Sequence, residues 1–309
     1  MSKRLLATFV LMGLVAPGTT MVAQAPRISN AKLSTQPAGG RLAETFRSLV
    51  AAQADIAWIG YSVPVSDRDR TMCCWSSGDG STYISGTISG NTACCGGCRL
   101  EPAADGATRP PVTTAAQTGP IKLEGSDRMI VLFRVAERRV ERVRSYSEDC
   151  GIDAGGRTVI WLQDVRPADS VALLESLVGV ENDRKNRVTT AALSAISMHA
   201  EPSAAQTIER LARTHAVPSI RGDAIFWLGQ MAGMKVAGTI TEAIANDPDT
   251  EVKKRAVFAL SQLPRGEGVQ LLIDVARKNP NPAVKKQAIF WLGQSKDPRA
   301  IDFFAQILK

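Results

Sequence analysis

Hydrophobic residues recur at a fixed spacing along the C-terminal half of the chain. In segment 252–262 they fall at offsets 0, 4, 5 and 8, which places them on one stripe of an α-helix: Val252, Ala256, Val257 and Leu260. The same pattern returns one period upstream, in 220–230, and one period downstream, in 284–294, and a weaker copy lies at 188–196. This spacing predicts a series of equivalent amphipathic helices.

A second amphipathic helix precedes each of these helices. Its apolar positions share the same 32-residue spacing, as Ile208, Ile240 and Leu272 show. Between paired helices, Pro beside Asp or Asn, as in segment 247–249, ends one helix and starts the next. A hairpin of this size buries its apolar stripe only against its neighbours, so the repeats predict a gently curved all-α solenoid over residues 167–309. The last helix, before the C-terminus, is expected to cap the array.

The repeat resembles that of a known family. Its turn carries the pattern Asp-Pro-x-x-x-Val-Lys-x-x-Ala, at Asp247, Pro248, Val252, Lys253 and Ala256. This pattern is similar to the short HEAT-like repeat associated with phycobilisome lyases. The resemblance implies a HEAT-like fold for residues 167–309, under half of the chain. It implies little about function, because such repeats occur in lyases, hydroxylases and plain scaffolds. A bilin-lyase activity rests on the resemblance alone.

The first residues have the pattern of a secretory signal peptide. Lys3 and Arg4 precede an apolar run over residues 5–16, which is followed by a Pro-Gly pair and small residues. The run is shorter than the about 20 residues of a transmembrane helix. We therefore expect a signal peptide over residues 1–25, a bacterial protein that is secreted or periplasmic, and no integral membrane span after cleavage.

The N-terminal half has different patterning. Residues 41–54 carry Leu42 and Phe46 at helical spacing, and later segments are rich in β-formers. The pattern predicts one helix over 41–54 and four strands, at residues 56–64, 129–135, 140–146 and 159–162. The second and third strands are close enough to form an antiparallel hairpin. The product is a small α+β domain over residues 26–166.

All six cysteines belong to this domain: Cys73, Cys74, Cys94, Cys95, Cys98 and Cys150. Several lie in a stretch, 76–120, that is rich in Ser, Thr, Gly, Ala and Pro. An even number of cysteines behind a signal peptide favours disulfides, with 15 possible pairings. Three bridges would staple a segment that builds no core, each contributing ~2–4 kcal/mol. We predict a disulfide-stapled module.

The Cys95-Gly-Gly-Cys98 segment leaves an alternative open. A C-x-x-C pair lets two thiolates reach one zinc ion, and it can also carry thiol-redox chemistry. The sequence offers neither a second C-x-x-C pair nor a nearby histidine for zinc, and no strand-to-helix context for a redox unit. We therefore expect no metal and no cofactor.

The net charge and the sequence motifs limit the classes of function that the chain can have. The chain has 37 Lys and Arg against 30 Asp and Glu, a net charge of +7, which is mild for a nucleic-acid-binding protein. The only histidines are His199 and His215, at helix ends or turns, and no nucleophile-elbow, metalloprotease or phosphate-loop motif occurs. These features favour a binding protein without catalytic activity and without a nucleic-acid partner.

Two groups of side chains are candidates for contact with an unidentified partner. The first lies on the second helix of each repeat and comprises Trp227, Trp291, Lys253, Lys254, Lys285 and Lys286, in a basic stripe that also includes Arg221 and Arg255. Phe226, Phe258 and Phe290 recur at one repeat position and are interpreted as packing between repeats. The second group is a set of arginines on the predicted hairpin: Arg134, Arg138, Arg139, Arg142 and Arg144. A solvated strand surface explains this set, and an anionic ligand is the functional alternative.

The sequence therefore predicts an extracytoplasmic protein-binding scaffold that uses a HEAT-like repeat surface. The alternative is a thiol-redox or zinc-dependent protein that uses Cys95 and Cys98.

Overall fold

The computed structural model describes residues 27–66, 74–77, 80–83, 98–101, 126–148, 150–179, 188–231 and 234–307. The expected signal peptide lies outside these residues, as do Cys73, Cys94 and Cys95. No helix among the described residues is long and apolar enough to cross a membrane.

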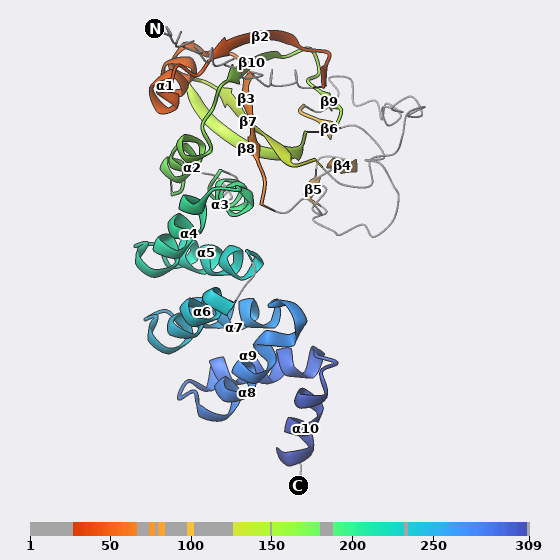
Figure 1. The fold of residues 1–309 in the computed structure, drawn as a ribbon, viewed down its shortest axis with the longest axis vertical. Helices are drawn as coiled ribbons and strands as arrows, with labels where there is room; N and C mark the ends of the chain where they lie inside the picture. The colour runs from red at the N-terminus through yellow and green to blue at the C-terminus, as the bar shows by residue number, and fades with distance from the viewer. Residues whose placement is uncertain are drawn as a thin grey trace, which may run out of the picture.

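The N-terminal part is built on a five-stranded mixed sheet with the strand order β2-β10-β3-β7-β8 (Figure 1). The strands are β2 (Lys32–Pro37), β3 (Ala57–Pro64), β7 (Arg128–Ala136), β8 (Arg139–Ser147) and β10 (Thr158–Gln163). Strand β10 lies parallel to both β2 and β3, whereas β7 and β8 continue the sheet in antiparallel fashion. Helix α1 (Leu42–Ala52) connects β2 to β3. The predicted helix and four strands are confirmed, and β2 is an addition.

The two faces of this sheet bury different cores. On one face, alternate residues of β3 such as Ile59 and Tyr61 pack with Phe133 of β7 and with Phe46 of α1. On the other face, Trp58, Leu132 and neighbouring residues form a smaller core under a three-stranded sheet of β1 (Ile28–Ser29), β9 (Ile152–Asp153) and β6 (Cys98–Arg99). Strands β4 (Cys74–Ser77) and β5 (Gly80–Tyr83) pair with each other.

Helical hairpins make up the C-terminal part, which extends away from the sheet in Figure 1. The helices are α2 (Pro167–Ser176), α3 (Thr189–Met198), α4 (Pro202–Thr214), α5 (Pro218–Gln230), α6 (Met234–Asn246), α7 (Thr250–Ser261), α8 (Glu267–Lys278), α9 (Pro282–Gln294) and α10 (Pro298–Ile307), with a short 3-10 turn, η2 (Pro264–Gly266). Successive second helices α3, α5, α7 and α9 pack on one another. The all-α repeat region is confirmed.

The predicted turns start the helices as expected. Asp249 is the N-cap of α7, and its carboxylate accepts the N–H of Glu251 at 2.7 Å and of Val252 at 3.2 Å. Asn281 does the same for α9, with Pro282 in the first helical turn. An Asp or Asn cap satisfies backbone donors that the helix itself leaves open, which fixes the start of each second helix.

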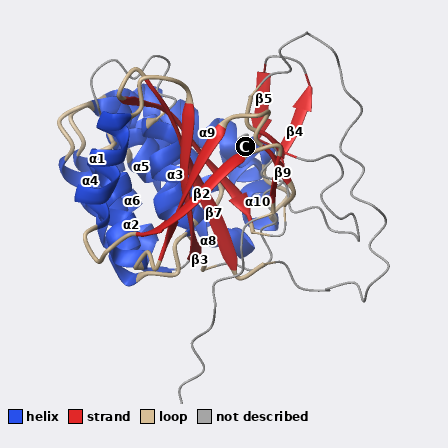
Figure 2. Cartoon of the chain, turned by 90° about the horizontal axis from the view of Figure 1, so that it is seen from above, coloured by secondary structure: helices blue, strands red, loops and turns tan. Residues whose placement is uncertain are grey.

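The sheet and the first helices of the array share one hydrophobic core. Beyond the end of β3, Val65 forms a β-bridge with His199, and Ser66 N–H donates to the Met198 carbonyl at 3.0 Å. Ala200 N–H donates to the Pro64 carbonyl at 3.1 Å. Helix α2 contacts β3 and α3 contacts β8, and in the view from above the strands lie across the helices (Figure 2). The array is therefore seated directly on the sheet.

A candidate protein-binding face on the repeat helices

The recurring phenylalanines form a row of contacting rings across α5, α7 and α9. Phe226 and Phe258 are stacked, with ring centroids 5.8 Å apart and planes 4° from parallel. Phe258 contacts Trp291 at 4.7 Å. Trp227 lies 5.1 Å from Phe226 at one end, and Phe290 lies 5.0 Å from Trp291 at the other. We call these five residues the aromatic strip.

The aromatic strip is open to solvent as well as packed between repeats. Phe290 is 53% exposed, and the other four rings are half-buried. The interpretation of the phenylalanines as packing between repeats is confirmed for Phe226 and Phe258, whereas Phe290 contacts the ring of Trp291 on its own helix. Because aromatic side chains dominate the energetics of protein interfaces, a half-exposed row of them is also a suitable contact surface.

The predicted lysines separate into different roles. Lys253 Nζ donates to the Ala245 carbonyl at 3.0 Å, at the C-terminal end of α6, where a cation also complements the helix dipole. Lys254 bonds both carboxylate oxygens of Glu251, a surface pair. Lys285 and Lys286 on α9 make no ion pair with a described residue. Lys254 and Lys286 lie one helical turn before Phe258 and Phe290, beside the aromatic strip.

Arg221 does not belong to a surface stripe, contrary to the sequence interpretation. Its Nε and Nη2 atoms bond the Asp247 carboxylate at 2.8 and 2.9 Å, and the two side chains are 9% and 7% exposed. Its Nη1 atom also donates to the His215 carbonyl at 2.9 Å. Burial opposes ionisation of Asp247, but the hydrogen bonds from Arg221 and from the Asp249 N–H outweigh it and lower the pKa of this carboxyl. The pair fixes α5 to the turn before α7.

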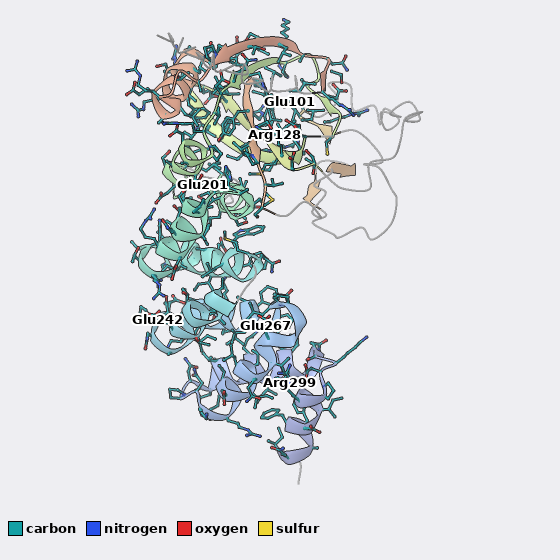
Figure 3. The ribbon with its side chains drawn as sticks, in the orientation of Figure 1. Glu101, Arg128, Glu201, Glu242, Glu267 and Arg299 are labelled. Atoms are coloured by element: carbon teal, nitrogen blue, oxygen red, sulfur yellow. The ribbon has the colours of Figure 1, made fainter. Side chains whose placement is uncertain are left out.

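Other ion pairs join neighbouring repeats nearer the surface. Arg255 on α7 pairs with Asp223 on α5, where burial raises the pKa of the aspartate. Arg213 on α4 pairs with Glu242 on α6, which is labelled in Figure 3. Sequence reasoning missed these pairs, although the 32-residue spacing already relates Asp223 to Arg255. The Arg255–Asp223 pair joins two second helices beside the aromatic strip, and the Arg213–Glu242 pair joins two first helices.

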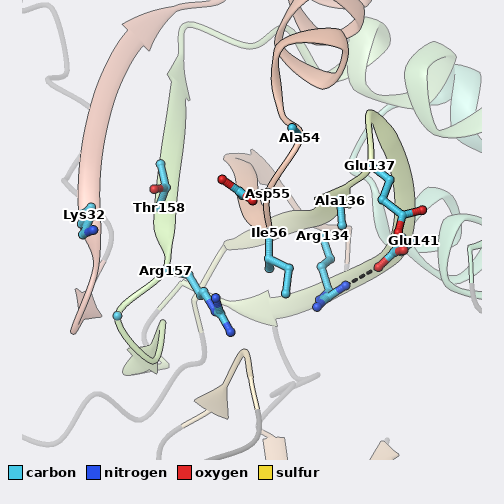
Figure 4. A pocket seen from close by; sticks show the side chains of 11 residues that line it. Lys32, Ala54, Asp55, Ile56, Arg134, Ala136, Glu137, Glu141, Arg157 and Thr158 are labelled. Atoms are coloured by element: carbon cyan, nitrogen blue, oxygen red, sulfur yellow. Dashed lines mark hydrogen bonds and ion pairs between the residues drawn. The ribbon is translucent and has the colours of Figure 1, made fainter. Parts of the chain in front are cut away.

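A cavity of about 580 Å³ lies at one end of the main sheet (Figure 4). Its lining includes three basic residues, Lys32, Arg134 and Arg157, and three acidic residues, Asp55, Glu137 and Glu141. Arg134 is only 17% exposed and bonds Glu101 at 2.8 Å and also Glu141. Glu101 accepts a further bond from Trp58 Nε1 at 3.0 Å. Because the charges balance and Arg134 is already paired, the cavity has no preference for an anion.

His199 lies in a buried polar chain where the sheet meets the array. Ser170 Oγ bonds both the Tyr61 hydroxyl and His199 Nε2, at 2.8 Å each. His199 Nδ1 lies 2.8 Å from the Ala195 carbonyl, which can only accept, so Nδ1 carries the proton and Nε2 accepts from Ser170. Burial lowers the pKa of His199 to about 4 and raises the pKa of Tyr61. All three side chains are at most 2% exposed, so this Ser-His pair is structural.

Three of the six predicted cysteines lie outside the described residues. Cys74 and Cys98 belong to β4 and β6, without described side chains. Cys150 is 1% exposed in the smaller core. No cysteine pair at disulfide distance and no group of three metal-ligating side chains occurs among the residues that the structure describes.

Comparison with known proteins identifies the repeats. Residues 238–309 match the family model described as HEAT repeats. No curated protein matches the chain. Among solved structures, human deoxyhypusine hydroxylase in complex with glycerol is 18% identical, with a TM-score of 0.32 over 44% of this chain and 43% of that one, so this chain spans less than half of its length. The complex of CpcE and CpcF of phycocyanin lyase from Nostoc sp. PCC7120 is 16% identical, with a TM-score of 0.35 over 46% of this chain and 89% of that one. The C-terminal part of the chain is thus built of HEAT-like repeats.

Proposed function

We propose that this chain is an extracytoplasmic protein-binding scaffold and that the aromatic strip is its contact surface. The observation that carries the proposal is the row of five touching rings that crosses three repeats and ends in the exposed Phe290. HEAT-like repeats are suited to this role because their stacked helices present an extended surface. Export rests on the pattern of the first residues, and the proposal assigns no catalytic step to the chain.

The side chains around the strip suggest the chemistry of the partner. Lys254 and Lys286 lie one turn before two of the rings, and Gln262 and Gln294 lie one turn after them. A segment that places apolar side chains on the rings and carboxylates toward the lysines complements this arrangement. Ion pairs between repeats, such as Arg221–Asp247, hold the helices in place. Binding therefore loses little conformational entropy in the helices.

The test is capture of proteins from the exported fraction on the immobilised chain, followed by titration of the captured partner against variants. Phe290→Ala is expected to raise the dissociation constant roughly 30-fold, the equivalent of about 2 kcal/mol for the loss of an aromatic anchor. Val217→Ala is the matched control, because Val217 is 45% exposed and lies off the strip. Equal affinity of both variants for the partner would refute the assignment of the strip.

A charge variant separates binding from folding. The triple change Lys254→Glu, Lys285→Glu and Lys286→Glu is expected to weaken capture and to leave the unfolding midpoint nearly unchanged, because these side chains lie at the surface. Lys253 is left intact, since it bonds the end of α6. Unchanged capture would exclude these three lysines as contacts with the partner.

We also propose that the six cysteines form three disulfides in the exported protein. The intact mass under non-reducing conditions is then about 6 Da below that of the reduced chain, with no labelling by a thiol-blocking reagent. Labelling of Cys95 and Cys98 only after denaturation, with a metal retained in the native mass spectrum, would favour the zinc-dependent alternative instead.

A further inference from the structure

One ridge of each second helix is covered by the next repeat. On α5 this ridge contains Gly222, Ile225 and Gly229, and the two glycines face Arg255 and Ala259 of α7. Ile225 is 0% exposed, and Val257, its counterpart on α7, is also 0% exposed. The position is therefore an interface position between repeats.

The corresponding ridge of α9 is covered only in part by described residues, because α10 places Phe304 near Gly293. Ile289 stands one repeat after Val257 and is 38% exposed. On the neighbouring helix, Ile301 of α10 is 61% exposed, whereas Val269, its counterpart on α8, is 6% exposed. We call the surface of Ile289 and Ile301 the distal face. A capping helix needs a polar outer surface, whereas α10 exposes Ile301 beside the polar Asp302.

We infer that the distal face binds the distal face of a second copy of this chain, giving a closed dimer with twofold symmetry. The face has the residue types of an interior repeat interface, so the surface that fits it is another repeat ridge. The chain carries such a ridge, covered only in part, at this end. At the other end of the array, α2 and α3 are already buried against β3 and β8, which blocks head-to-tail growth. Two distal faces that meet each other form a twofold contact, which closes the assembly at two copies.

The charges near the distal face are compatible with this symmetry. Lys286 on α9 and Asp302 on α10 are both exposed, and neither makes an ion pair with a described residue. In a twofold interface, a residue of one copy meets a different residue of the other, and the contact occurs twice. A contact between Lys286 of one copy and Asp302 of the other would therefore occur twice, and its opposite charges would favour the dimer.

The test is the mass of the purified chain in solution, measured by light scattering across a wide range of concentrations. We expect a concentration-dependent mass that reaches twice the mass of the purified chain and does not exceed it. Ile301→Asp is expected to raise the dimer dissociation constant at least tenfold, because it buries a charge in the interface. Leu33→Asp is the matched control, since Leu33 is 44% exposed on β2 and lies far from α10 (Figure 1).

Two further variants keep the test independent of folding, and their readout is the mass in solution, because Lys286 also borders the aromatic strip. Lys286→Asp alone is expected to weaken the dimer, and Lys286→Asp with Asp302→Lys is expected to restore it. Trp227→Ala, in the aromatic strip, should leave the dimer intact while it weakens partner capture. A monomer at every concentration, assemblies beyond two copies, or a dimer indifferent to Ile301→Asp would each overturn the inference.

Discussion

The buried histidine makes the stability of the protein depend on pH in a specific window. His199 has a pKa of about 4 in the folded chain, because burial disfavours its charged form more than the Ala195 carbonyl and the Glu201 carboxylate favour it. Its ordinary value is 6.5. As pH falls below 6.5, the unfolded chain takes up the proton and the folded chain does not. The free energy of unfolding therefore falls between pH 6.5 and about 4, and this contribution is fully present only above that window.

The size of the effect follows from the two pKa values. Each pKa unit corresponds to about 1.4 kcal/mol, so the shift from 6.5 to about 4 amounts to about 3 kcal/mol of unfolding free energy. This is a large share of the about 5–15 kcal/mol that stabilises an ordinary domain. Protonation would also place a second donor on Nε2 against Ser170, which now donates to it.

The assay is urea unfolding of the wild type and of His199→Gln at several pH values from 7 to 4. The variant is less stable at pH 7, and its deficit is expected to shrink by about 3 kcal/mol as pH falls to 4. Taking the difference between the two proteins cancels the titration of carboxylates such as Asp247, whose lowered pKa acts in both. His215→Gln, on a turn of the array, serves as the control. Parallel pH profiles for wild type and His199→Gln would refute the reasoning.

Two further predictions concern the packing of the repeats. Arg221→Met leaves the buried Asp247 carboxylate without its partner and is expected to lower the unfolding free energy by about 3–5 kcal/mol in urea titrations. Arg213→Met removes a pair at the surface, in which the arginine side chain is 39% exposed, and should lower the unfolding free energy by less than about 1 kcal/mol. Similar losses in both variants would contradict the role of burial. Gly268→Ala would place a Cβ atom 1.8 Å from the Leu260 carbonyl oxygen and is expected to lower the thermal midpoint strongly. In Gly238→Ala, on α6, the added Cβ atom has no other atom within 4 Å, so the unfolding free energy should rise by up to about 1 kcal/mol. A lower unfolding free energy would show that the free space around a glycine does not determine the effect of its substitution.

Periodicity made the repeat region readable from sequence. Apolar positions one repeat apart, such as Val252 and Val284, predicted both the second helices and their buried stripe, and Asp249 starts α7 as its turn pattern indicates. Strand β2 was not predicted from the sequence, because five of its six residues are exposed and no buried face requires alternating hydrophobic residues there. Local patterns predict elements that bury a face.

Contacts between distant residues were beyond the same reasoning. Tyr61 and Ser170 are 109 residues apart, and nothing local marks them as partners of His199. Arg221 was assigned to the surface because its repeat counterparts are lysines, while its burial depends on Asp247 in the following turn. The recurrence of the phenylalanines was visible in the sequence, but the order of Phe and Trp rings along the strip depends on the offset between neighbouring helices.

The two ends of the array differ in a way that links assembly to stability. A repeat array is stabilised by each unit and by its contacts with its neighbours, so a unit with one uncovered side opens first. The sheet covers the α2–α3 end with a shared core, whereas Ile289 and Ile301 are exposed at the α9–α10 end. A second copy on the distal face would supply the missing neighbour and stabilise α9 and α10 by mass action. Since α9 carries Phe290 and Trp291, dimerisation would also order the end of the aromatic strip that is most open to a partner.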